Sequence, residues 1–307
     1  MEPYDAKLIP EAFGFNNTGV ICYFNSFLQT LVGCSAFTTS VLSNSDYLKC
    51  TTTGTAVLDF VTSYVVDSIS INRSDKMAFK SSMVLKALVS DLAARRPNVR
   101  FGGGQESASE ALIHLLDMIE PPRAVGQNPI TNLFKHRFSC ELHCDNCNNK
   151  IVSSTIDYAV NFNLFDEKMF EQQDVASFSK AICSHKSKTE DYLCPSCLKK
   201  TTAIRVYDLI MIPEIIFCMF NLYGEVRRAR YFPETLEFPA IKGGKLIYKI
   251  VGQIEHAGSL SGGHYWAHGL RAGDRVYRLN DTSVSLSAFV PSANTYIVVY
   301  HFVNTIH

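Results

Sequence analysis

Two Cys-x-x-Cys pairs constrain this chain more than any other feature of its sequence. Cys144 and Cys147 form the first pair, Cys194 and Cys197 form the second, and residues 148–193 separate them. Four thiolates complete the tetrahedral ligand set of a structural Zn²⁺, and a two-residue spacing lets one tight turn supply two ligands. Because the separation is longer than a compact zinc ribbon needs, we expect two hairpins that strands bring together around one structural zinc ion.

Other sulfur and imidazole groups lie near these pairs in the sequence. Cys140 and His143 could each replace a ligand, whereas Cys183 and His185 are interpreted as bystanders. The competing explanation is a set of four unrelated buried thiols, and the polar turn residues that follow each pair argue against it. Redox chemistry of the thioredoxin kind is not favoured, because neither pair opens a helix after a strand.

Composition narrows the classes of protein and partner. Hydrophobic residues make up 47% of the 307 residues and charged residues 19%, which is typical of a globular chain with a large core. The 29 basic and 29 acidic side chains balance, which argues against a generic nucleic-acid binder. No stretch reaches the ~20 apolar residues of a membrane span, and the N-terminus does not resemble a signal peptide. We therefore expect an intracellular protein, cytoplasmic and/or nuclear, with neither nucleic acid nor membrane as a partner.

Apolar periodicity divides the chain into a helical first part and a sheet-forming second part. Phe24, Phe27, Leu28 and Leu31 share one face of a helix predicted over residues 20–32. Further helices are predicted over residues 56–71, 77–94, 108–119 and 170–183. Runs of β-branched and aromatic residues predict strands over residues 152–164, 202–211, 215–223, 246–254, 265–270, 276–279 and 296–302. A cleft between two such lobes is the expected place for a site.

Cys22 lies where the first predicted helix follows a loop. A helix N-terminus stabilises a thiolate, so Cys22 is the candidate nucleophile. Asn17, five residues earlier, is a candidate oxyanion donor beside the backbone N–H of Cys22. The remaining isolated cysteines are interpreted as small buried hydrophobic residues: Cys34, Cys50 and Cys218.

His264 is the candidate general base because a glycine-rich run of small residues, 258–263, leads directly into it. If the hairpin that follows is centred near Ala272, paired residues have numbers that sum to 544, and Asn280 then lies opposite His264. An amide in that place would hold the imidazole tautomer, while a slip of one residue would bring Asp281 within reach instead. The other histidines are interpreted as structural or surface residues: His114, His136, His143, His185, His256, His268, His301 and His307.

These motifs together resemble the catalytic domain of ubiquitin-specific proteases (peptidase family C19) over nearly the whole chain. Residues 14–29, Gly-Phe-Asn-Asn-Thr-Gly-Val-Ile-Cys-Tyr-Phe-Asn-Ser-Phe-Leu-Gln, are similar to the family's Cys box, and residues 105–117 are similar to its Gln-Gln-Asp-Ala-x-Glu-Phe helix. The paired cysteines match its zinc finger, and residues 296–300 its last strand. The His box matches at Tyr248, His256, Gly258, Gly263, His264, Tyr265, Tyr277, Asn280, Asp281 and Val284.

The resemblance implies an α+β fold in one catalytic domain over residues 1–307. Its papain-like cysteine protease core would comprise a helical thumb over about residues 1–125 and zinc-bearing β fingers over about 130–160 and 188–235. The antiparallel β palm would be formed by the remaining segments, mainly residues 236–307.

The resemblance also implies a function, namely a deubiquitinating cysteine protease that cleaves after the C-terminal glycine of ubiquitin. Cys22 would attack that glycine's carbonyl, His264 would shuttle the proton, Asn280 would orient His264, and Asn17 would stabilise the oxyanion, with Asp281 assisting. The tail of ubiquitin, Leu-Arg-Leu-Arg-Gly-Gly, would thread a narrow cleft. The implied substrate-binding residues are Gln105, Glu106, Glu110, Gly258, Gly262, Gly263 and Tyr265.

Some positions depart from the family pattern. Val20 and Ile21 replace Asn-Thr before the nucleophile, and Ser107 stands where the family has an aspartate that pairs with an arginine of the ubiquitin tail. The alternatives are therefore a protease for a ubiquitin-like modifier and a weakly active ubiquitin-binding module. A structural zinc protein would not explain the Cys and His boxes, and another papain-like hydrolase would not explain the finger cysteines. An activating or targeting partner is also envisaged.

Overall fold

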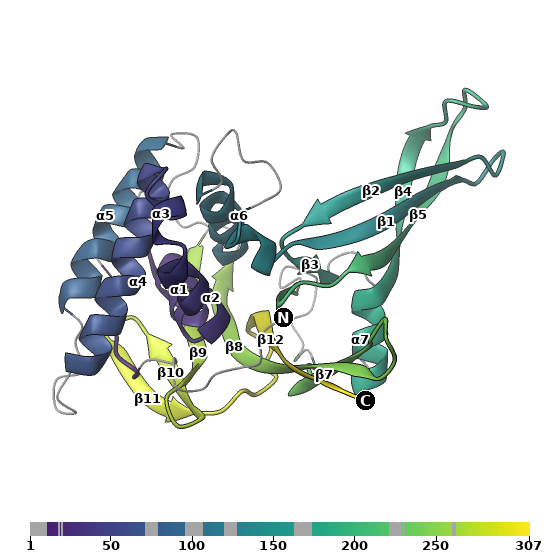
Figure 1. Cartoon of the computed structure of the whole chain (residues 1–307). Coiled ribbons are helices and arrows are strands. Elements are labelled where there is room, and N and C mark those ends of the chain that lie inside the picture. The colour runs from purple at the N-terminus through teal and green to yellow at the C-terminus, as the bar shows by residue number, and fades with distance from the viewer. Residues whose placement is uncertain are drawn as a thin grey trace.

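The computed structural model describes residues 11–307 apart from residues 18, 20, 71–78, 96–106, 120–127, 163–173, 221–228, 230, 260 and 261. Figure 1 shows a group of helices on one side of a large sheet and a narrow arm of two hairpins projecting from the other side. The expected α+β architecture is confirmed, with a helical thumb, a β palm and β fingers. The predicted residue boundaries of these three parts stay predictions.

The thumb is built from six of the described helices, and each long helix lies where apolar periodicity predicts one. Their bounds are α1 (Cys22–Val32), α2 (Ser35–Ser43), α3 (Ser45–Leu48), α4 (Thr52–Ser70), α5 (Phe79–Arg95) and α6 (Ala108–Ile119). Every residue of α1 is buried, including the polar Asn25 and Gln29. The helix that carries Cys22 is therefore enclosed on all sides rather than lying on the surface.

The palm is an eight-stranded sheet in the order β11-β10-β9-β8-β12-β6-β3, with β7 also paired to β8. Its strands are β3 (Val160–Asn161), β6 (Ile215–Met219), β7 (Thr235–Pro239), β8 (Lys245–Ser259), β9 (Gly262–Arg271), β10 (Arg275–Asn280), β11 (Ser283–Ser287) and β12 (Thr295–Ile306). All described pairs are antiparallel except β3 with β6. The predicted strand over 152–164 divides into β2 and β3.

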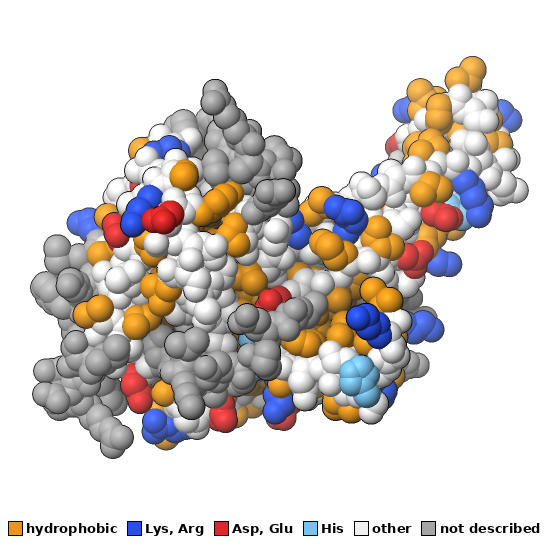
Figure 2. Space-filling view, in the orientation of Figure 1, with side chains coloured by type: hydrophobic (Ala, Val, Ile, Leu, Met, Phe, Trp, Pro, Cys, Tyr) orange, Lys and Arg blue, Asp and Glu red, His pale blue; other side chains and the backbone are white. Residues whose placement is uncertain are grey.

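The fingers are a separate four-stranded sheet in the order β2-β1-β5-β4. Its strands are β1 (His136–Cys144), β2 (Lys150–Asp157), β4 (Ser184–Leu193) and β5 (Lys200–Met211). Figure 2 shows this arm standing clear of the body, with hydrophobic side chains at its tip, where Leu193 and Leu198 are 61% and 77% exposed. In the distal half of the described fingers, the buried residues are Cys144, Cys194 and Ala203, so the tip has almost no hydrophobic core of its own.

Hydrophobic cores lie on both faces of the palm sheet. On one face, α1 packs against β8 and β9, and its Phe27 ring lies 6.4 Å from that of Phe217. On the other face, α7 (Val175–Cys183) contributes Phe178, which lies 6.3 Å from the ring of Tyr300. The short 3-10 helix η2 (Thr131–Leu133) leads into the fingers. No helix in the described part of the chain is long and apolar enough to cross a membrane.

Candidate active site and metal centre

Cys22 is the first residue of α1, as the sequence predicts, and only 4% of it is exposed. Burial raises the pKa of the Cys22 thiol, and the negative charge of Asp281 raises it further. A backbone hydrogen bond from Tyr265 lowers this pKa, as do the N–H groups of Tyr23 and Cys22 at the start of the helix. The net pKa is raised, so burial outweighs the helix N-terminus and the thiol needs a base to remove its proton.

The backbone of Tyr265, the residue that follows His264, donates a hydrogen bond to the Cys22 thiol, so strand β9 meets the start of α1 one residue after the candidate base. The Nε2 atom of His264 is 2.6 Å from Oδ1 of Asn280, which is the predicted orienting contact. An amide oxygen accepts a proton only from N–H, so this bond selects the tautomer with the proton on Nε2 and leaves Nδ1 to act as a base.

The predicted register of this hairpin is wrong by two residues. Arg271 pairs with Arg275 and Ala267 with Leu279, so paired numbers sum to 546 and the turn is centred on Gly273. A shift of two residues keeps each side chain on its face of the sheet. His264 and Asn280 are therefore diagonal neighbours rather than directly opposite, and long side chains on diagonal positions still meet.

Trp266 and Arg278 stack in series on the His264 ring, which is a contact that sequence analysis did not predict. The Trp266 ring lies 6.2 Å from the His264 ring at an angle of 25°, and the Arg278 guanidinium lies 5.2 Å from the centre of the Trp266 ring. Residues 264 and 266 share one face of β9, which is the signal in the sequence that could have suggested the contact. This stack restricts the imidazole from one side.

Asp281 connects two asparagines of the Cys box. Its Oδ2 accepts from Nδ2 of Asn17 at 3.0 Å, and its Oδ1 accepts from Nδ2 of Asn25 at 2.7 Å. Asn17 also accepts from the backbone N–H of Ile21 at 3.3 Å, one residue before the nucleophile. Both ends of the Asn17 amide, the predicted oxyanion donor, are therefore fixed by hydrogen bonds, Nδ2 by Asp281 and Oδ1 by Ile21. The second N–H of Nδ2 remains for a substrate.

A close backbone approach fixes the place of Asp281. Its carbonyl accepts from the N–H of Phe15 at 2.9 Å, and a Cβ at Gly14 would lie 2.6 Å from the same oxygen. Only glycine fits at position 14 without moving the turn. Asp281 itself has a φ of 49°, the left-handed conformation that aspartate tolerates better than most residues.

The candidate substrate-binding residues divide into two groups. Gly258 pairs with Gly263 in the β8–β9 hairpin, and a Cβ at Gly258 would lie 2.3 Å from the Cα of Gly263. Gly262 lies in the same hairpin, and the Tyr265 side chain is buried with its ring 4.2 Å from that of His256. Glu110 is an exposed residue of α6. Gln105 and Glu106 lie outside the described residues, and the substrate-binding role of all seven stays a prediction.

Ser107, the position that departs from the family pattern, belongs to a cluster of three hydroxyls. Its Oγ lies 2.6 Å from Oγ of Ser109 and 2.7 Å from the Tyr296 hydroxyl, and the last two are 2.8 Å apart. Ser107 precedes α6 and accepts from the N–H of Ser109 at 3.2 Å. This end of α6 therefore presents neutral hydroxyls where an aspartate would present a charge.

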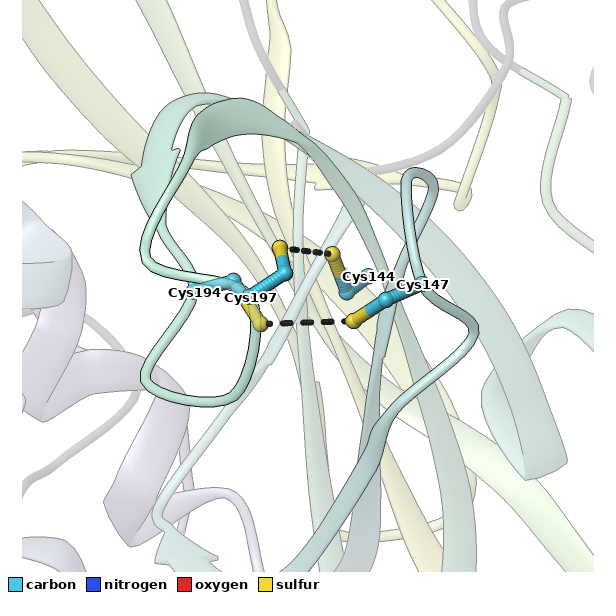
Figure 3. Close-up of side chains that lie close together, drawn as sticks. All are labelled: Cys144, Cys147, Cys194 and Cys197. Atoms are coloured by element: carbon cyan, nitrogen blue, oxygen red, sulfur yellow. Dashed lines mark hydrogen bonds between the residues drawn. The ribbon is translucent and has the colours of Figure 1, made fainter.

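The four predicted metal ligands come together at the tip of the fingers, and Figure 3 shows their sulfur atoms facing one another. All four Sγ atoms lie within 4.8 Å of one another, with Cys144 to Cys197 at 4.0 Å and Cys147 to Cys194 at 3.7 Å. Sulfurs at about 2.3 Å from a tetrahedral Zn²⁺ would be roughly 3.8 Å apart. The site therefore fits zinc.

Both cysteine pairs use the same turn. Cys144 N–H donates to the Asn149 carbonyl at 3.0 Å, and Cys194 N–H donates to the Lys199 carbonyl at 3.1 Å. Asn148 and Leu198, which follow each pair, have φ values of 54° and 56°. Two repeated turns thus present two thiols each to one point, as the spacing of the pairs predicts.

The neighbouring cysteines and histidines are not part of this described cluster. His143 instead contacts the Glu141 carboxylate, with Nε2 at 3.0 Å from Oε2. Cys140 lies farther down β1 and is buried. Cys34 and Cys218 are buried as predicted, whereas Cys50 is exposed, so its interpretation as a buried hydrophobic residue is wrong. It follows α3, a single helical turn too short to cover it.

Comparisons with known proteins agree with this geometry. The sequence profile of the family described as Ubiquitin carboxyl-terminal hydrolase matches residues 13–300. Ubiquitin carboxyl-terminal hydrolase 25 of Arabidopsis thaliana is 24% identical over 319 residues, covering 94% of this chain and 47% of that protein. Ubiquitin carboxyl-terminal hydrolase 36 of Drosophila erecta is 23% identical over 322 residues, covering 94% and 28%. This chain therefore spans less than half the length of these two relatives.

Solved structures show the same fold. The SAGA DUB module of Ubp8, Sgf11, Sus1 and Sgf73 bound to monoubiquitin contains a chain that matches with a TM-score of 0.73 at 17% identity, covering 100% of this chain and 72% of that one. The same module bound to ubiquitin aldehyde matches with a TM-score of 0.72 at 18% identity, with the same coverage.

Proposed function

This chain belongs to the ubiquitin carboxyl-terminal hydrolase family, and on that premise we propose that it is a deubiquitinating cysteine protease. Its substrates would be ubiquitin precursors or ubiquitinated proteins, cleaved after the C-terminal glycine of ubiquitin. The observation that carries the proposal is the hydrogen bond of 2.6 Å between His264 and Asn280. Tyr265, the residue after His264 on β9, hydrogen-bonds the Cys22 thiol through its backbone. Nucleophile, base and orienting amide are thereby arranged in series.

In the proposed acylation step, Nδ1 of His264 takes the Cys22 proton as the sulfur attacks the glycine carbonyl. Because the pKa of Cys22 is raised, the proton leaves during attack rather than beforehand. The resulting oxyanion accepts hydrogen bonds from Nδ2 of Asn17 and the backbone N–H of Cys22. His264 then gives the proton to the departing amine, and a thioester joins Cys22 to ubiquitin.

In the proposed deacylation step, His264 removes a proton from water, and the resulting nucleophile attacks the thioester carbonyl. The same oxyanion donors stabilise this second tetrahedral intermediate. The thiol leaves with the proton that His264 returns, which regenerates the free enzyme. Throughout, Asn280 keeps the imidazole plane and tautomer fixed, and Asp281 acts by positioning Asn17 rather than by exchanging protons.

We propose that Cys144, Cys147, Cys194 and Cys197 hold a structural Zn²⁺. Four thiolates leave no open position for a substrate or a water, so the metal would stabilise the fingers and take no part in hydrolysis. None of the ten cysteines forms a disulfide, which fits the proposed location in a reducing compartment such as cytoplasm or nucleus. An activating or targeting partner remains a prediction.

A second candidate function is cleavage after a ubiquitin-like modifier with the same Gly-Gly end. The observation in its favour is the hydroxyl cluster of Ser107, Ser109 and Tyr296, which offers an arginine no charge. A weakly active ubiquitin-binding module would need a damaged triad. The chain carries Cys22, His264 and Asn280, so we do not favour that alternative.

The proposal can be tested with a ubiquitin probe that carries a C-terminal electrophile. Wild type, Cys22→Ala and Cys50→Ala are compared, because Cys50 is an exposed thiol outside the cleft. We expect one covalent adduct on wild type and on Cys50→Ala, and none on Cys22→Ala. Reaction only with a ubiquitin-like probe would support the second candidate. Tight ubiquitin binding with no adduct from any probe would refute the enzyme and favour the binding module.

A further inference from the structure

Arg271, the last residue of β9, has a fully buried guanidinium whose function the proposed mechanism does not explain. Its exposed fraction is 0%, and its Nε donates to the Tyr64 hydroxyl at 3.1 Å. Nη1 donates to the Leu270 carbonyl at 2.8 Å. Nη2 donates to both the backbone oxygen and Oε1 of Gln29, at 2.9 and 2.5 Å. Removing an arginine from water is costly, so a cation kept here with no ion-pair partner among the described carboxylates calls for an explanation.

No carboxylate in the described part of the chain forms an ion pair with Arg271. Its acceptors are carbonyls, an amide and a phenol, and its guanidinium also lies 5.9 Å from the centre of the Tyr64 ring. Two glycines make room for it, since a Cβ at Gly33 or Gly269 would lie 2.6 or 2.7 Å from Nη1. The pocket is therefore shaped around the guanidinium.

The contact with Gln29 joins Arg271 to the helix of the nucleophile. Helix α1 begins with Cys22 and ends at Val32, so Gln29 lies in its last turn, where carbonyl groups lack helical partners and attract a cation. The Gln29 amide also donates to the Phe13 carbonyl at 2.8 Å, which extends the connection to the chain before Cys22.

Helix α1 and strand β9 are thus attached at two separate places. At the start of both elements, the backbone of Tyr265 bonds the Cys22 thiol. Near the end of both, Arg271 bonds Gln29. Packing of α1 on β8 and β9 already holds the helix against the sheet, and these two polar contacts fix its register on β9 at each end. Because Cys22 and His264 lie on these two elements, the second attachment controls how closely sulfur and imidazole approach.

We propose that Arg271 is a positioning residue that sets the geometry between Cys22 and His264 from the opposite end of their elements. This inference rests on the proposed function. Misplacing reacting groups by ~1 Å costs on the order of 100-fold in rate. Arg271 is buried and does not reach the substrate, so its replacement should lower kcat while leaving KM unchanged.

The test compares wild type with Arg271→Lys and with Arg275→Lys as the matched control. Lysine keeps the charge but cannot bond Tyr64, Leu270 and Gln29 together. Arg275 lies four residues further along the same hairpin, and its side chain is 49% exposed. Its Nε donates to the Ala272 carbonyl at 3.3 Å, and its guanidinium lies 3.9 Å from the Glu11 carboxylate and 5.9 Å from the centre of the Tyr277 ring. We expect Arg271→Lys to lower kcat 10- to 100-fold with unchanged KM on a fluorogenic ubiquitin substrate, and Arg275→Lys to match wild type.

Alkylation of Cys22 by iodoacetamide, followed across pH, supplies a readout that does not depend on ubiquitin. If Arg271 sets the Cys22–His264 geometry, Arg271→Lys should shift the pH dependence of alkylation, and Arg275→Lys should not. This measurement stays valid if wild type turns over no ubiquitin substrate, so failure of the proposed function and failure of this inference are distinguishable.

The inference is overturned if folded Arg271→Lys retains wild-type kcat and alkylation profile. It is also overturned if the loss of activity equals the fraction of protein that fails active-site titration, because that is a purely structural effect. Should Arg271→Lys not fold, Gln29→Met removes the side-chain acceptor of Arg271, together with the Gln29 hydrogen bonds to Phe13 and Tyr64, and keeps the backbone acceptor. A wild-type profile in that folded variant would equally contradict the proposal, and a lowered kcat with unchanged KM would support it.

Discussion

Replacing Asp281 by asparagine separates two opposite effects of one carboxylate. Asp281 holds the amides of Asn17 and Asn25 at 3.0 and 2.7 Å, and its negative charge raises the pKa of Cys22. Asparagine keeps the shape but turns one acceptor into a donor. One of the two amides will then face an N–H group and lose its bond.

The structure indicates which bond is lost. Asn25 is only 2% exposed and makes the shorter contact, whereas Asn17 is exposed and can turn to water. Leaving a buried amide unpaired costs more, so the new side chain keeps its oxygen toward Asn25. Asn17 then loses a charge-assisted bond of about 1.5–3 kcal/mol and its fixed orientation. Loss of one oxyanion donor lowers kcat by about 100-fold or more.

The thiol should respond in the opposite direction. Removing the negative charge lowers the pKa of Cys22, so more thiolate exists at a given pH below that pKa. The assays are kcat on a fluorogenic ubiquitin substrate and the rate of iodoacetamide alkylation between pH 6 and 10. We expect Asp281→Asn to lose kcat while its alkylation midpoint moves to lower pH.

Asn280→Ala provides the contrast, because it removes the orienting partner of His264 without removing a charge near Cys22. We expect this variant to lose kcat. Its alkylation midpoint should not move to lower pH, because no carboxylate has been removed. The reasoning is refuted if Asp281→Asn keeps kcat within about two-fold of wild type. An upward shift of its alkylation midpoint would contradict the electrostatic part alone.

Three further changes test other parts of the molecule. A chelator should release one zinc ion from wild type, raise KM for ubiquitin and leave alkylation of Cys22 unchanged. Cys197→Ser should have the same effect on KM, whereas the control Cys140→Ser should keep its zinc. A wild-type protein purified without metal would contradict this prediction. Ser107→Asp should raise kcat/KM about 10-fold on a ubiquitin substrate, because the new carboxylate can pair with an arginine of the ubiquitin tail. The gain should vanish on a ubiquitin whose two tail arginines are replaced by alanine. Burial lowers the pKa of His136 to about 4, so an unfolded chain binds its proton below pH 6.5 and a folded one does not. Stability should therefore fall by about 3 kcal/mol from pH 6.5 to 4 relative to His136→Phe, measured by urea unfolding; parallel pH profiles would refute it.

Sequence patterns were sufficient where an element is rich in apolar residues with a clear period or a continuous run. The helices α1 and α6 carry apolar residues at helical spacing, and β12 begins with a continuous run of β-branched and aromatic residues that is buried on both faces of the palm, so their positions could be predicted. The metal ligands could be predicted because each Cys-x-x-Cys pair needs only its own turn. Strand β4 could not, because its residues are mostly polar and charged, and it becomes a strand through pairing with β5.

Sequence reasoning could name the candidate site residues but could not predict the contacts that connect them. His264 and Asn280 could be predicted to lie on the same face of the hairpin. The turn at Gly273 and Asp274, with φ of 73° and 54°, nevertheless places the register two residues away from the predicted one. The Asp281–Asn17 contact and the Arg271–Gln29 contact join segments more than 200 residues apart. No local pattern specifies such pairs, because they depend on how α1 docks on the palm.

The long separation of the contacts around Asp281 also sets when the proposed protease activity could begin during synthesis of the chain. Asn17 and Asp281 are 264 residues apart in the chain, and Cys22 precedes His264 by nearly as much. At about 5–20 residues per second, the nucleophile leaves the ribosome roughly 12 to 50 seconds before its base is made. During that interval α1 has no β9 to lie against, and the thiol has neither base nor positioned oxyanion donor. The proposed proteolytic activity would therefore begin only when the last strands of the palm have folded, and it would report a finished domain.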